Sequence, residues 1–245
     1  MFIRGDEMRL GIMQPYLFPY IGYFQLINAV DKYIIYGDVQ YKRKGWINRN
    51  NYLNFIRSGS QNPLLFTFKV KNDSYVKNIC EREYSADFET DKKNFLILLN
   101  QIYRKAPYYA ETLDVILDIF NYESDNVAEF NANSIMRISE YLGINTEFSF
   151  SSELVVPSEL KSQSRTIWLC KYCEADTYIN AIGGQDLYSY EDFAKEGIQL
   201  HFLKTGDVRY PQFDRVFTPN LSIVDVMMFN SPENIEKILN DYSLL

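Results

Sequence analysis

Hydrophobic and polar positions alternate along this chain in a way that predicts an α/β fold. Short apolar runs, typical of buried strands, are separated by segments in which apolar residues recur every three or four positions, typical of helices. We expect strands at residues 10–13, 33–36, 52–56, 64–70, 146–150, 177–181 and 200–203. We expect helices at residues 24–30, 109–121, 127–142, 162–174, 190–196, 222–229 and 232–239, and a largely helical pattern throughout 76–142.

The order of these elements predicts a doubly wound parallel sheet of the Rossmann-like type. A strand–helix–strand unit precedes the helical block, and a β-α-β-α-β series follows it. Such alternation is typical of parallel sheets with helices on both faces. We therefore expect a single α/β domain over residues 8–245, with 76–142 as a helical insertion within it. Residues 58–63 are expected to close a hairpin, and the polar residues 1–7 to form an N-terminal extension.

Composition and charge narrow the class of protein. The chain has 245 residues, of which 47% are hydrophobic, so it can bury a full core. A net charge of −7 argues against nucleic-acid binding. No apolar run approaches the roughly 20 residues that span a bilayer, so we expect no stable membrane insertion. Three cysteines make no disulfide framework and no signal peptide is visible, so we expect a cytoplasmic protein.

The loop after the first strand is the first candidate ligand site. It lies between a strand and a helix N-terminus, whose unpaired N–H groups favour an anion. Two prolines limit the freedom of the loop, and a glycine permits close backbone approach. An aromatic-rich packing corner is the alternative interpretation. The candidate binding residues here are Gln14, Pro15, Tyr16, Tyr20, Gly22 and Tyr23.

Residues 40–50 form the densest cationic run in this acidic chain. They follow the second strand, and ligands of doubly wound sheets bind at the carboxyl ends of strands. Lysine and arginine hold phosphate or carboxylate, and tryptophan stacks on a base or sugar. A solvated loop with one buried tryptophan is the alternative. The candidates are Asp38, at the end of the strand, and Gln40, Lys44, Trp46, Asn48 and Arg49.

Two later segments carry weaker signals for anion binding. Gly183 and Gly184 follow the strand at 177–181, where backbone amides can cradle a phosphate, although a plain turn is the alternative. The pair lacks the Lys-Ser/Thr ending of a P-loop and the third glycine of a dinucleotide fingerprint. Lys161 and Arg165 lie at a helix start, which also suits an anion. Ordinary capping by the neighbouring serines is the alternative there.

The remaining chemistry-bearing residues favour structural roles. Cys170 and Cys173 are spaced as two small buried residues on one helix face and form a poor zinc site alone, so no metal site is predicted. His201 is the single histidine and falls in an expected strand, which disfavours a His-dependent triad. Asn220 lies in a loop that can reach the same end of the sheet. Alternatively, Asn220 or Ser222 caps the helix that carries Asp225.

Four of these motifs, in their order along the chain, resemble those of the WbqC-like protein family. They are residues 13–24 (MQPYLFPYIGYF), 38–49 (DVQ and KGWINR), 183–188 (GG and LY, which adds Tyr188 to the candidates) and 219–225 (PNLSIVD). The resemblance runs from residue 10 to about residue 239. It implies a role in the bacterial gene clusters that make O-antigen and other surface polysaccharides.

A more distant resemblance links residues 20–23 to the His-x-Gly-His loop of nucleotidylyltransferases and pantothenate synthetase. It implies a Rossmann-like fold of the HUP type and binding of ATP phosphates, with residues 162–165 as the later helix-start motif. Tyrosines stand where both histidines are expected, and tyrosine is uncharged at neutral pH. Positive charge at a transferring phosphoryl or adenylyl group would then come from Lys44, Arg49, Lys161 and Arg165.

Three functions are consistent with these patterns. The first is a nucleotide- or sugar-nucleotide-dependent transferase or amide-forming ligase, for example one that acylates an amino sugar with a small acid or amino acid. ATP or another nucleotide with Mg²⁺ would be the cofactor, and Asp38, Lys44 and Arg49 the catalytic candidates. The second is a metal-independent glycosyltransferase, since no Asp-x-Asp motif is present. The third is a noncatalytic binding protein of the glycan machinery. The substrate and the oligomeric state stay open.

Overall fold

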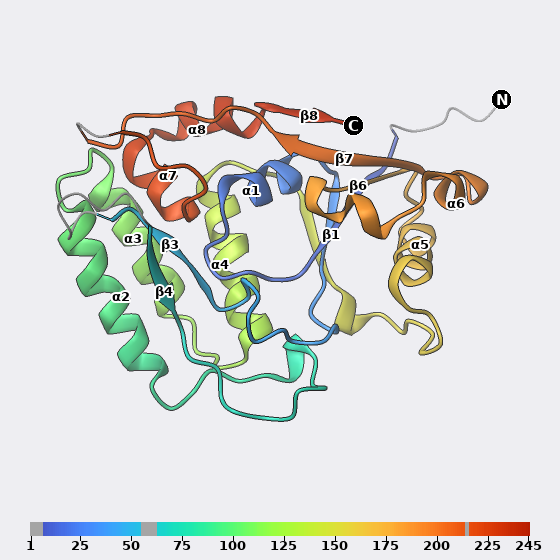
Figure 1. Cartoon of the computed structure of the whole chain (residues 1–245), viewed down its shortest axis with the longest axis horizontal. Coiled ribbons are helices and arrows are strands. Elements are labelled where there is room, and N and C mark those ends of the chain that lie inside the picture. Colours follow the sequence, from blue (N-terminus) through green and yellow to red (C-terminus); the bar gives the residue numbers. More distant parts are fainter. Residues whose placement is uncertain (1–6, 55–62, 214–215) are drawn as a thin grey trace.

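The computed structural model describes residues 7–54, 63–213 and 216–245. Its main element is a six-stranded sheet with the order β5-β2-β1-β6-β7-β8 (Figure 1). Five neighbouring strands run parallel, and β8 runs antiparallel to β7 at one edge. The strands are β1 (Arg9–Met13), β2 (Lys32–Ile35), β5 (Glu147–Phe150), β6 (Thr177–Ala181), β7 (Gln199–Thr205) and β8 (Tyr242–Leu244).

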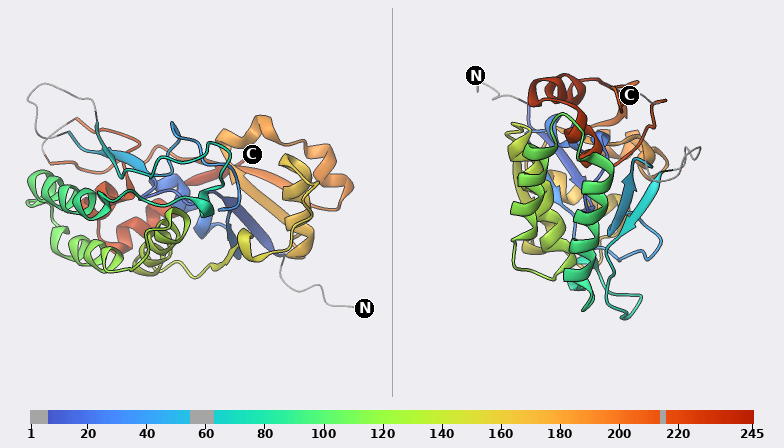
Figure 2. Two further views of the ribbon diagram at one scale, coloured as in Figure 1. Left: turned by 90° about the horizontal axis from the view of Figure 1, so that it is seen from below. Right: turned by 90° about the vertical axis from the view of Figure 1, so that its left-hand side faces the viewer.

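The strand order makes this a doubly wound, Rossmann-like α/β fold. From β1 the chain proceeds outward through β2 to β5 on one side, and then through β6 and β7 on the other. Helices cover both faces of the sheet (Figure 2). They are α1 (Ile21–Asn28), α2 (Phe88–Tyr103), α3 (Tyr109–Phe120), α4 (Val127–Tyr141), α5 (Ser162–Tyr172), α6 (Tyr190–Lys195), α7 (Ile223–Phe229) and α8 (Pro232–Leu239). Three short 3-10 helices are η1 (Ile79–Glu81), η2 (Ser151–Glu153) and η3 (Ile182–Leu187).

Side chains that alternate along the strands form two hydrophobic layers. Leu10 and Ile12 of β1 pack with Tyr178, Leu169 and Phe193 under α5 and α6. The opposite face of the sheet packs against α1 and α8. Because both faces are covered, the inner strands are buried almost throughout, which explains their continuous apolar runs.

Between β2 and β5 the chain adds a hairpin and three helices at the end of the molecule opposite α5 and α6 (Figure 1). The hairpin pairs β3 (Arg49–Tyr52) with β4 (Leu64–Thr67). Its aromatic rings pack on α2, where Phe95 lies 5.1 Å from the ring centroids of Phe18, Tyr52 and Phe66. Phe18 belongs to the loop after β1, so this aromatic cluster holds that loop against the insertion.

The expected strands and helices are present, with three informative differences. β6 and α8 have the expected bounds, but α1 begins at Ile21 rather than residue 24. The strand expected at 52–56 instead begins at Arg49, within the polar run, because Asn50 buries its amide through tertiary hydrogen bonds. The edge strand β8 was not expected at all. Residues 1–6 of the expected extension, and 55–62 around the expected hairpin turn, lie outside the described residues.

Among the described residues, no helix is both long enough and apolar enough to cross a membrane.

Candidate functional site

The loops that follow β1, β2, β6 and β7 leave the parallel sheet at its carboxyl edge. Strand order reverses between β1 and β6, and this is the position at which doubly wound sheets bind their ligands. Several of the sequence-predicted residues belong to these loops. Their side chains, however, lie in three separate surroundings: an aromatic cavity, a buried ion pair and a basic cavity.

Three sequence motifs meet at the backbone of Phe18. Its carbonyl accepts hydrogen bonds from Asn50 Nδ2 at 2.8 Å and from Ser222 Oγ at 2.8 Å. The amide of Ser222 donates to the carbonyl of Asn51 at 3.0 Å. Phe18 has a φ of 45°, a left-handed conformation that is unusual for a bulky residue. Contacts from distant segments therefore impose the shape of this loop.

Asn131 of α4 connects the loop after β1 to the cationic run of residues 40–50, and the sequence did not lead us to predict this role. Its buried Nδ2 donates to the carbonyls of Pro15 at 3.0 Å and Ile47 at 2.8 Å. Its Oδ1 accepts from Tyr84 Oη at 2.6 Å. The signal was available, because Asn131 lies four residues after Val127 on the apolar face of the helix. A polar side chain at such a position needs buried partners.

The aromatic cavity lies where these motifs converge, and it has a volume of about 330 Å³. It is lined by Tyr16, Pro19, Tyr20, Trp46, Asn50 and Asn220. Four of the six (Tyr16, Tyr20, Trp46 and Asn220) are sequence-predicted binding residues from three separate segments. Trp46 remains 51% exposed, so its indole ring is accessible to a ligand. Flat aromatic walls with amide and hydroxyl groups at the edges suit a ring that carries polar substituents.

The two tyrosines of the aromatic cavity are uncharged hydrogen-bonding groups. Burial raises the pKa of Tyr16, and the nearby Tyr20 raises it further. Burial also raises the pKa of Tyr20, although a hydrogen bond with Thr205 partly opposes this effect. Both hydroxyls therefore stay protonated at neutral pH and can donate as well as accept.

A second cavity of about 330 Å³ adjoins the first and shares Tyr20 and Asn220 with it. It extends to the end of β7, where Thr205 lies. A Cβ atom at Gly22 would lie 2.5 Å from Thr205 Oγ1, so only glycine fits at this position. The sequence predicted close backbone approach at Gly22, and the structure shows that two side chains approach it: the ring of Tyr20, at 2.4 Å from such a Cβ, and Thr205 of β7.

Asp225 lies beside this second cavity as a buried carboxyl. Tyr103 Oη donates to it at 2.8 Å, Tyr210 Oη at 2.7 Å and Gln212 Nε2 at 2.7 Å. Burial raises its pKa to about 6, although the three hydrogen bonds act in the opposite direction. Ser222 caps the helix that carries it, with Oγ accepting from the amide of Val224 at 3.3 Å. Of the two capping residues proposed from the sequence, the structure selects Ser222.

Asp38 and Arg165 form an ion pair between the end of β2 and the first turn of α5. Their side chains are only 19% and 17% exposed. The second oxygen of Asp38 accepts from Ser151 Oγ, directly after β5. Arg165 also lies 5.4 Å from the ring centroid of Tyr36, and among the described residues its Nε has no partner. Burial raises the pKa of Tyr36 to about 12, while the Arg165 charge opposes that rise.

Gly183, Gly184 and Tyr188 belong to the segment that follows β6, and this segment contacts α5, the helix that carries Arg165. Gly184 is buried, and a Cβ there would lie 2.7 Å from Asn180 Nδ2, whereas Gly183 is exposed with open space around it. Tyr188 Oη lies 3.4 Å from Thr166 Oγ1 on α5, one residue beyond Arg165. These contacts connect the loop after β6 to the start of α5.

Several candidates hold the structure together rather than line a cavity. Tyr23 is buried and donates to the carbonyl of Gln14 at 2.9 Å, and burial raises its pKa far above the ordinary value. Pro15 is buried beneath the loop. Lys161 occupies the N-cap position of α5, where Ser164 Oγ donates to its carbonyl at 2.8 Å. Neither Ser162 nor Ser164 is therefore the N-cap that the alternative interpretation expected, although Ser164 Oγ also accepts from the amide of Lys161 at 3.2 Å.

The side chains of the cationic run lie in several different surroundings. Lys44 is exposed, and Gln40 donates to the carbonyl of Tyr75 at 2.9 Å. Asn48 is buried, accepting from Tyr41 at 3.0 Å and donating to the carbonyl of Phe68 at 2.6 Å. Arg49 lies in a cavity of about 240 Å³, here called the basic cavity. Its charged lining residues are Arg43, Arg49, Lys69, Lys71 and Arg82.

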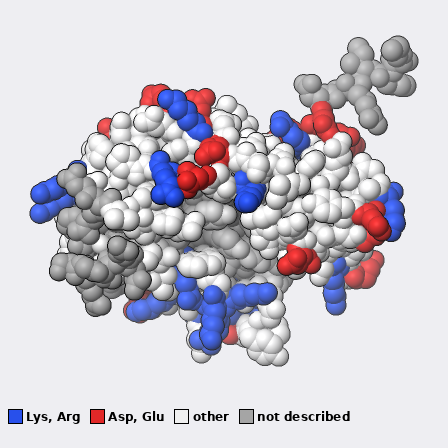
Figure 3. Space-filling view, turned by 45° about the horizontal axis from the view of Figure 1, so that its top comes forward, with Lys and Arg blue, Asp and Glu red and all other residues white. Residues whose placement is uncertain are grey.

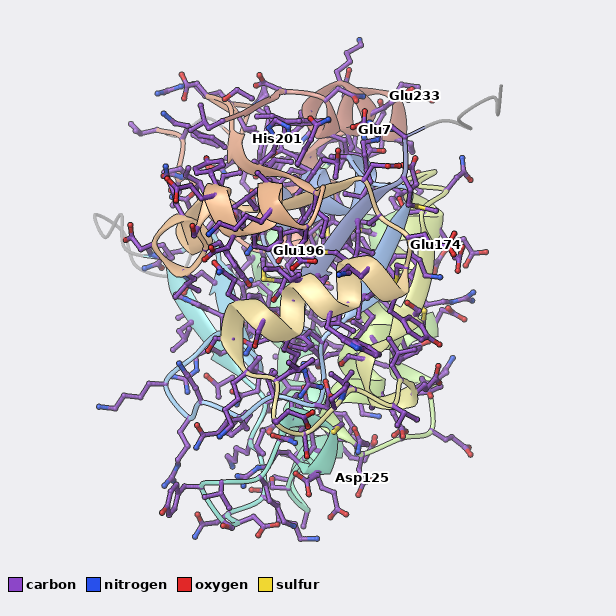
Figure 4. All side chains as sticks on the ribbon, turned by 90° about the vertical axis from the view of Figure 1, so that its right-hand side faces the viewer. Glu7, Asp125, Glu174, Glu196, His201 and Glu233 are labelled. Atoms are coloured by element: carbon purple, nitrogen blue, oxygen red, sulfur yellow. The ribbon has the colours of Figure 1, made fainter. Side chains whose placement is uncertain are left out.

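Other features of the chain do not join these sites. A hollow of about 510 Å³ beside α5 is lined by residues such as Trp168 and Tyr172 and by none of the predicted binding residues. Figure 4 shows α5 and α6 with His201 above them, and Asp125 at the far end of the molecule. Cys170 lies on the buried face of α5, and burial raises its pKa. The described residues contain no group of three His, Cys, Asp or Glu side chains placed to hold a metal ion.

Comparison with known proteins identifies the family of this chain. The sequence profile of the WbqC-like protein family matches residues 14–237, which include all three converging segments. The chain belongs to the WbqC-like protein family. A relative from Mycobacterium tuberculosis, the uncharacterized protein Rv1507c, is 28% identical over 227 residues, which cover 91% of this chain and 93% of the relative. No solved structure matches the chain significantly. For this WbqC-like protein, the site geometry must therefore carry the functional argument.

Proposed function

We propose that this WbqC-like protein is a nucleotide- or sugar-nucleotide-dependent transferase or amide-forming ligase of bacterial surface-polysaccharide synthesis, O-antigen included. The observation that carries the proposal is the convergence of Tyr16, Tyr20, Trp46 and Asn220 on one cavity at the carboxyl edge of a doubly wound sheet. Ligand sites of such sheets occur at this edge, and stacked aromatic walls suit a sugar or a base. Nucleotide-activated donors are cytoplasmic, so we place the reaction there.

In this proposal the aromatic cavity binds the ring of the substrate. Trp46 and Tyr16 supply flat faces for stacking, and Tyr20 and Asn220 supply hydrogen bonds to ring substituents. Asn50 contributes mainly shape, because its Nδ2 donates to Phe18 and its Oδ1 accepts from the amide of Asn51 at 2.8 Å. The specificity of the cavity would therefore depend chiefly on Tyr20 and Asn220.

The partly buried ion pair of Asp38 and Arg165 supports a second role near the same end of the sheet. Arg165 has an Nε without a partner among the described residues, and Tyr36 keeps its hydroxyl proton at neutral pH. Together they suit a carboxylate or phosphate of the second substrate, while Asp38 keeps the guanidinium in position. One concrete reaction is the activation of a small acid by ATP with Mg²⁺, forming an acyl-adenylate and releasing pyrophosphate. The amine of an amino sugar then attacks the acyl carbon, AMP leaves, and an amide forms.

One observation favours a noncatalytic alternative. None of the three predicted catalytic residues lines the aromatic cavity, since Lys44 is exposed, Arg49 lines the basic cavity and Asp38 is held by Arg165. A glycan-binding protein needs only the aromatic walls. A metal-independent glycosyltransferase would bind a sugar nucleotide at the aromatic walls and release its nucleotide without the help of Mg²⁺.

The two tryptophans of the chain allow a direct binding test. Trp46 lines the aromatic cavity, whereas Trp168 lies on α5 and stacks on Tyr172 at 5.1 Å. We expect ATP, a UDP-sugar or a dTDP-sugar to change the intrinsic fluorescence of the wild type. Trp168→Phe should keep that change, and Trp46→Phe should abolish it. A change that follows Trp168 instead, or none with any donor, would contradict binding in the aromatic cavity.

Turnover then separates the three functions. The ligand identified by fluorescence is incubated with the protein, Mg²⁺, an amino sugar and a mixture of small acids, and the products are separated by liquid chromatography. Release of AMP and pyrophosphate with an amide product supports the ligase. Release of UDP or dTDP without Mg²⁺ supports the glycosyltransferase. Binding without any released nucleotide supports the noncatalytic protein and overturns the proposal of an enzyme.

A further inference from the structure

The basic cavity lies on the opposite side of β3 from the aromatic cavity and is built from three segments. Arg43 and Arg49 come from the cationic run, Lys69 and Lys71 from the chain after β4, and Arg82 from the residue that follows η1. Arg49 pairs in register with Thr67, which also lines the cavity. Lys and Arg side chains gather along the lower edge of the face in Figure 3, where few acidic side chains are visible.

Arg82 is the most deeply buried cation of the cavity, at 4% exposure. Its guanidinium donates to the carbonyls of Ser74 at 2.9 Å and Lys71 at 3.0 Å and lies 4.9 Å from the ring centroid of Tyr41. Within the described part of the chain it has no carboxylate partner, and its buried Nε has no hydrogen-bond partner. Two neutral carbonyls and one ring compensate a buried positive charge only in part.

Arg49 repeats this pattern. Its Nη2 donates to the carbonyl of Arg43, so one cation is held beside another rather than beside an acid. Its buried Nε has no partner among the residues that the structure describes. Lys69 and Lys71 are paired, with Asp87 at 2.8 Å and Glu83 at 2.7 Å, but neither acid lines the cavity. Among the described residues, none of the three arginines forms an ion pair with an acid. Asp73 pairs with Lys77, which lowers its pKa, and lies close enough for the Arg82 charge to lower that pKa further, but it does not line the cavity.

The charges and the size of the basic cavity indicate which kind of ligand it can bind. Guanidinium groups bind phosphate oxygens through paired N–H donors, and several of them together select a multiply charged anion. The cavity is smaller than the roughly 300–1,000 Å³ typical of sites for whole small-molecule ligands. It can hold about eight waters at ~30 Å³ each, enough for a phosphate or diphosphate.

We propose that the basic cavity is a phosphate-binding site that holds a phosphate or diphosphate group, free or as part of a nucleotide, through Arg43, Arg49 and Arg82. The proposal goes beyond the proposed function and does not depend on it. In a chain with a net charge of −7, such a site binds a defined anion rather than polyanions in general.

The test is isothermal titration calorimetry of the full chain with inorganic pyrophosphate and, separately, with UDP. The variants are Arg43→Ala, which is exposed and leaves the fold intact, and Arg49→Ala. Lys42→Ala is the matched control, because it removes the same charge from the same exposed loop but does not line the cavity. Melting temperatures confirm that each variant is folded. We expect both arginine variants to weaken binding about tenfold or more and Lys42→Ala less than about twofold.

Each outcome decides a specific point. If the two arginine variants weaken the binding, tighter binding of pyrophosphate identifies a free diphosphate as the ligand, and tighter binding of UDP identifies a nucleotide-borne one. UDP binding that is weakened by Trp46→Phe but by neither arginine variant belongs to the aromatic cavity and counts against the basic cavity. No binding of either probe up to about 10 mM, or equal weakening by Lys42→Ala and Arg43→Ala, overturns the proposal. Trp46→Phe should leave pyrophosphate binding unchanged. A failure of the aromatic cavity to bind sugar nucleotides is thereby distinguishable from a failure of the basic cavity.

Discussion

Arg49 and Asn50 are neighbours in β3, yet they line two different cavities. Arg49 contributes its guanidinium to the basic cavity, and Asn50 contributes to the aromatic cavity on the other side. Successive side chains of a strand point to opposite faces, so a single short strand separates the two sites. The cationic run thus serves two surfaces, with Trp46 on one and Arg43 on the other.

The first prediction concerns Asn131, which joins the first loop to the cationic run. Asn131→Leu removes the donor to the Pro15 carbonyl, one of the two donors to the Ile47 carbonyl, which keeps the Leu17 amide, and the acceptor of Tyr84 Oη. Each lost buried hydrogen bond costs about 1–3 kcal/mol, so we expect the free energy of unfolding to fall by about 2–5 kcal/mol in urea titrations. Asn133→Ala on the same helix is the control and should change it by less than about 1 kcal/mol. Equal effects of the two substitutions would show that Asn131 does not anchor the loops.

The second prediction concerns the contact between Gly22 and Thr205. Gly22→Ala places a methyl group 2.5 Å from Thr205 Oγ1 and closer still to the Tyr20 ring. We expect a loss of stability of about 1–3 kcal/mol, measured by chemical denaturation. Gly183→Ala, where a new Cβ meets nothing within 4 Å, is the control and should be nearly neutral. Thr205→Ala should recover only part of the loss in the double variant, because the Tyr20 ring still lies 2.4 Å from the new methyl group. A loss for Gly22→Ala no larger than that for Gly183→Ala would contradict the steric explanation.

The third prediction concerns the pair of Asp38 and Arg165. Because both side chains are largely buried, removal of one leaves the other charge without a partner. A double-mutant cycle with Asp38→Asn and Arg165→Met should give a coupling energy of about 1–3 kcal/mol. The exposed pair Arg9–Asp31, at 49% and 43% exposure, is the reference and should give less than about 1 kcal/mol. Coupling energies of similar size would mean that burial does not strengthen the pair.

The fourth prediction is a pH dependence that originates at Asp225. Its pKa rises from an ordinary 3.8 to about 6 on folding, so the folded chain binds this proton more tightly than the unfolded chain. The contribution is fully present below pH 3.8 and is lost as the pH rises through about 6. Two pKa units correspond to about 3 kcal/mol. The stability of the wild type minus that of Asp225→Asn should therefore fall by about 2–3 kcal/mol between about pH 4 and pH 7.5. A difference that stays constant or rises with pH would contradict the raised pKa of Asp225.

The sequence by itself determined the class of fold. Apolar runs at residues 177–181 and 10–13 predicted β6 and β1, because strands buried on both faces must be apolar throughout. The order of strands and helices then predicted the doubly wound sheet. The positions of the candidate residues after the strands predicted a ligand site at the carboxyl ends of those strands. The candidates at that edge followed from the same rule, since parallel strands all end on one side.

Only the tertiary structure decided which candidates meet. Asp38 and Arg165 are far apart in the chain, and no local pattern pairs them. The sequence did not predict that β3 begins at Arg49, because the polar side chain of Asn50 is buried only through its hydrogen bond to the carbonyl of Phe18, a residue outside the strand. Likewise, the division of the cationic run between two cavities depends on which side of β3 each side chain lies. Periodicity reports how a residue relates to its own helix or strand, whereas a site depends on contacts between elements that only the folded chain brings together.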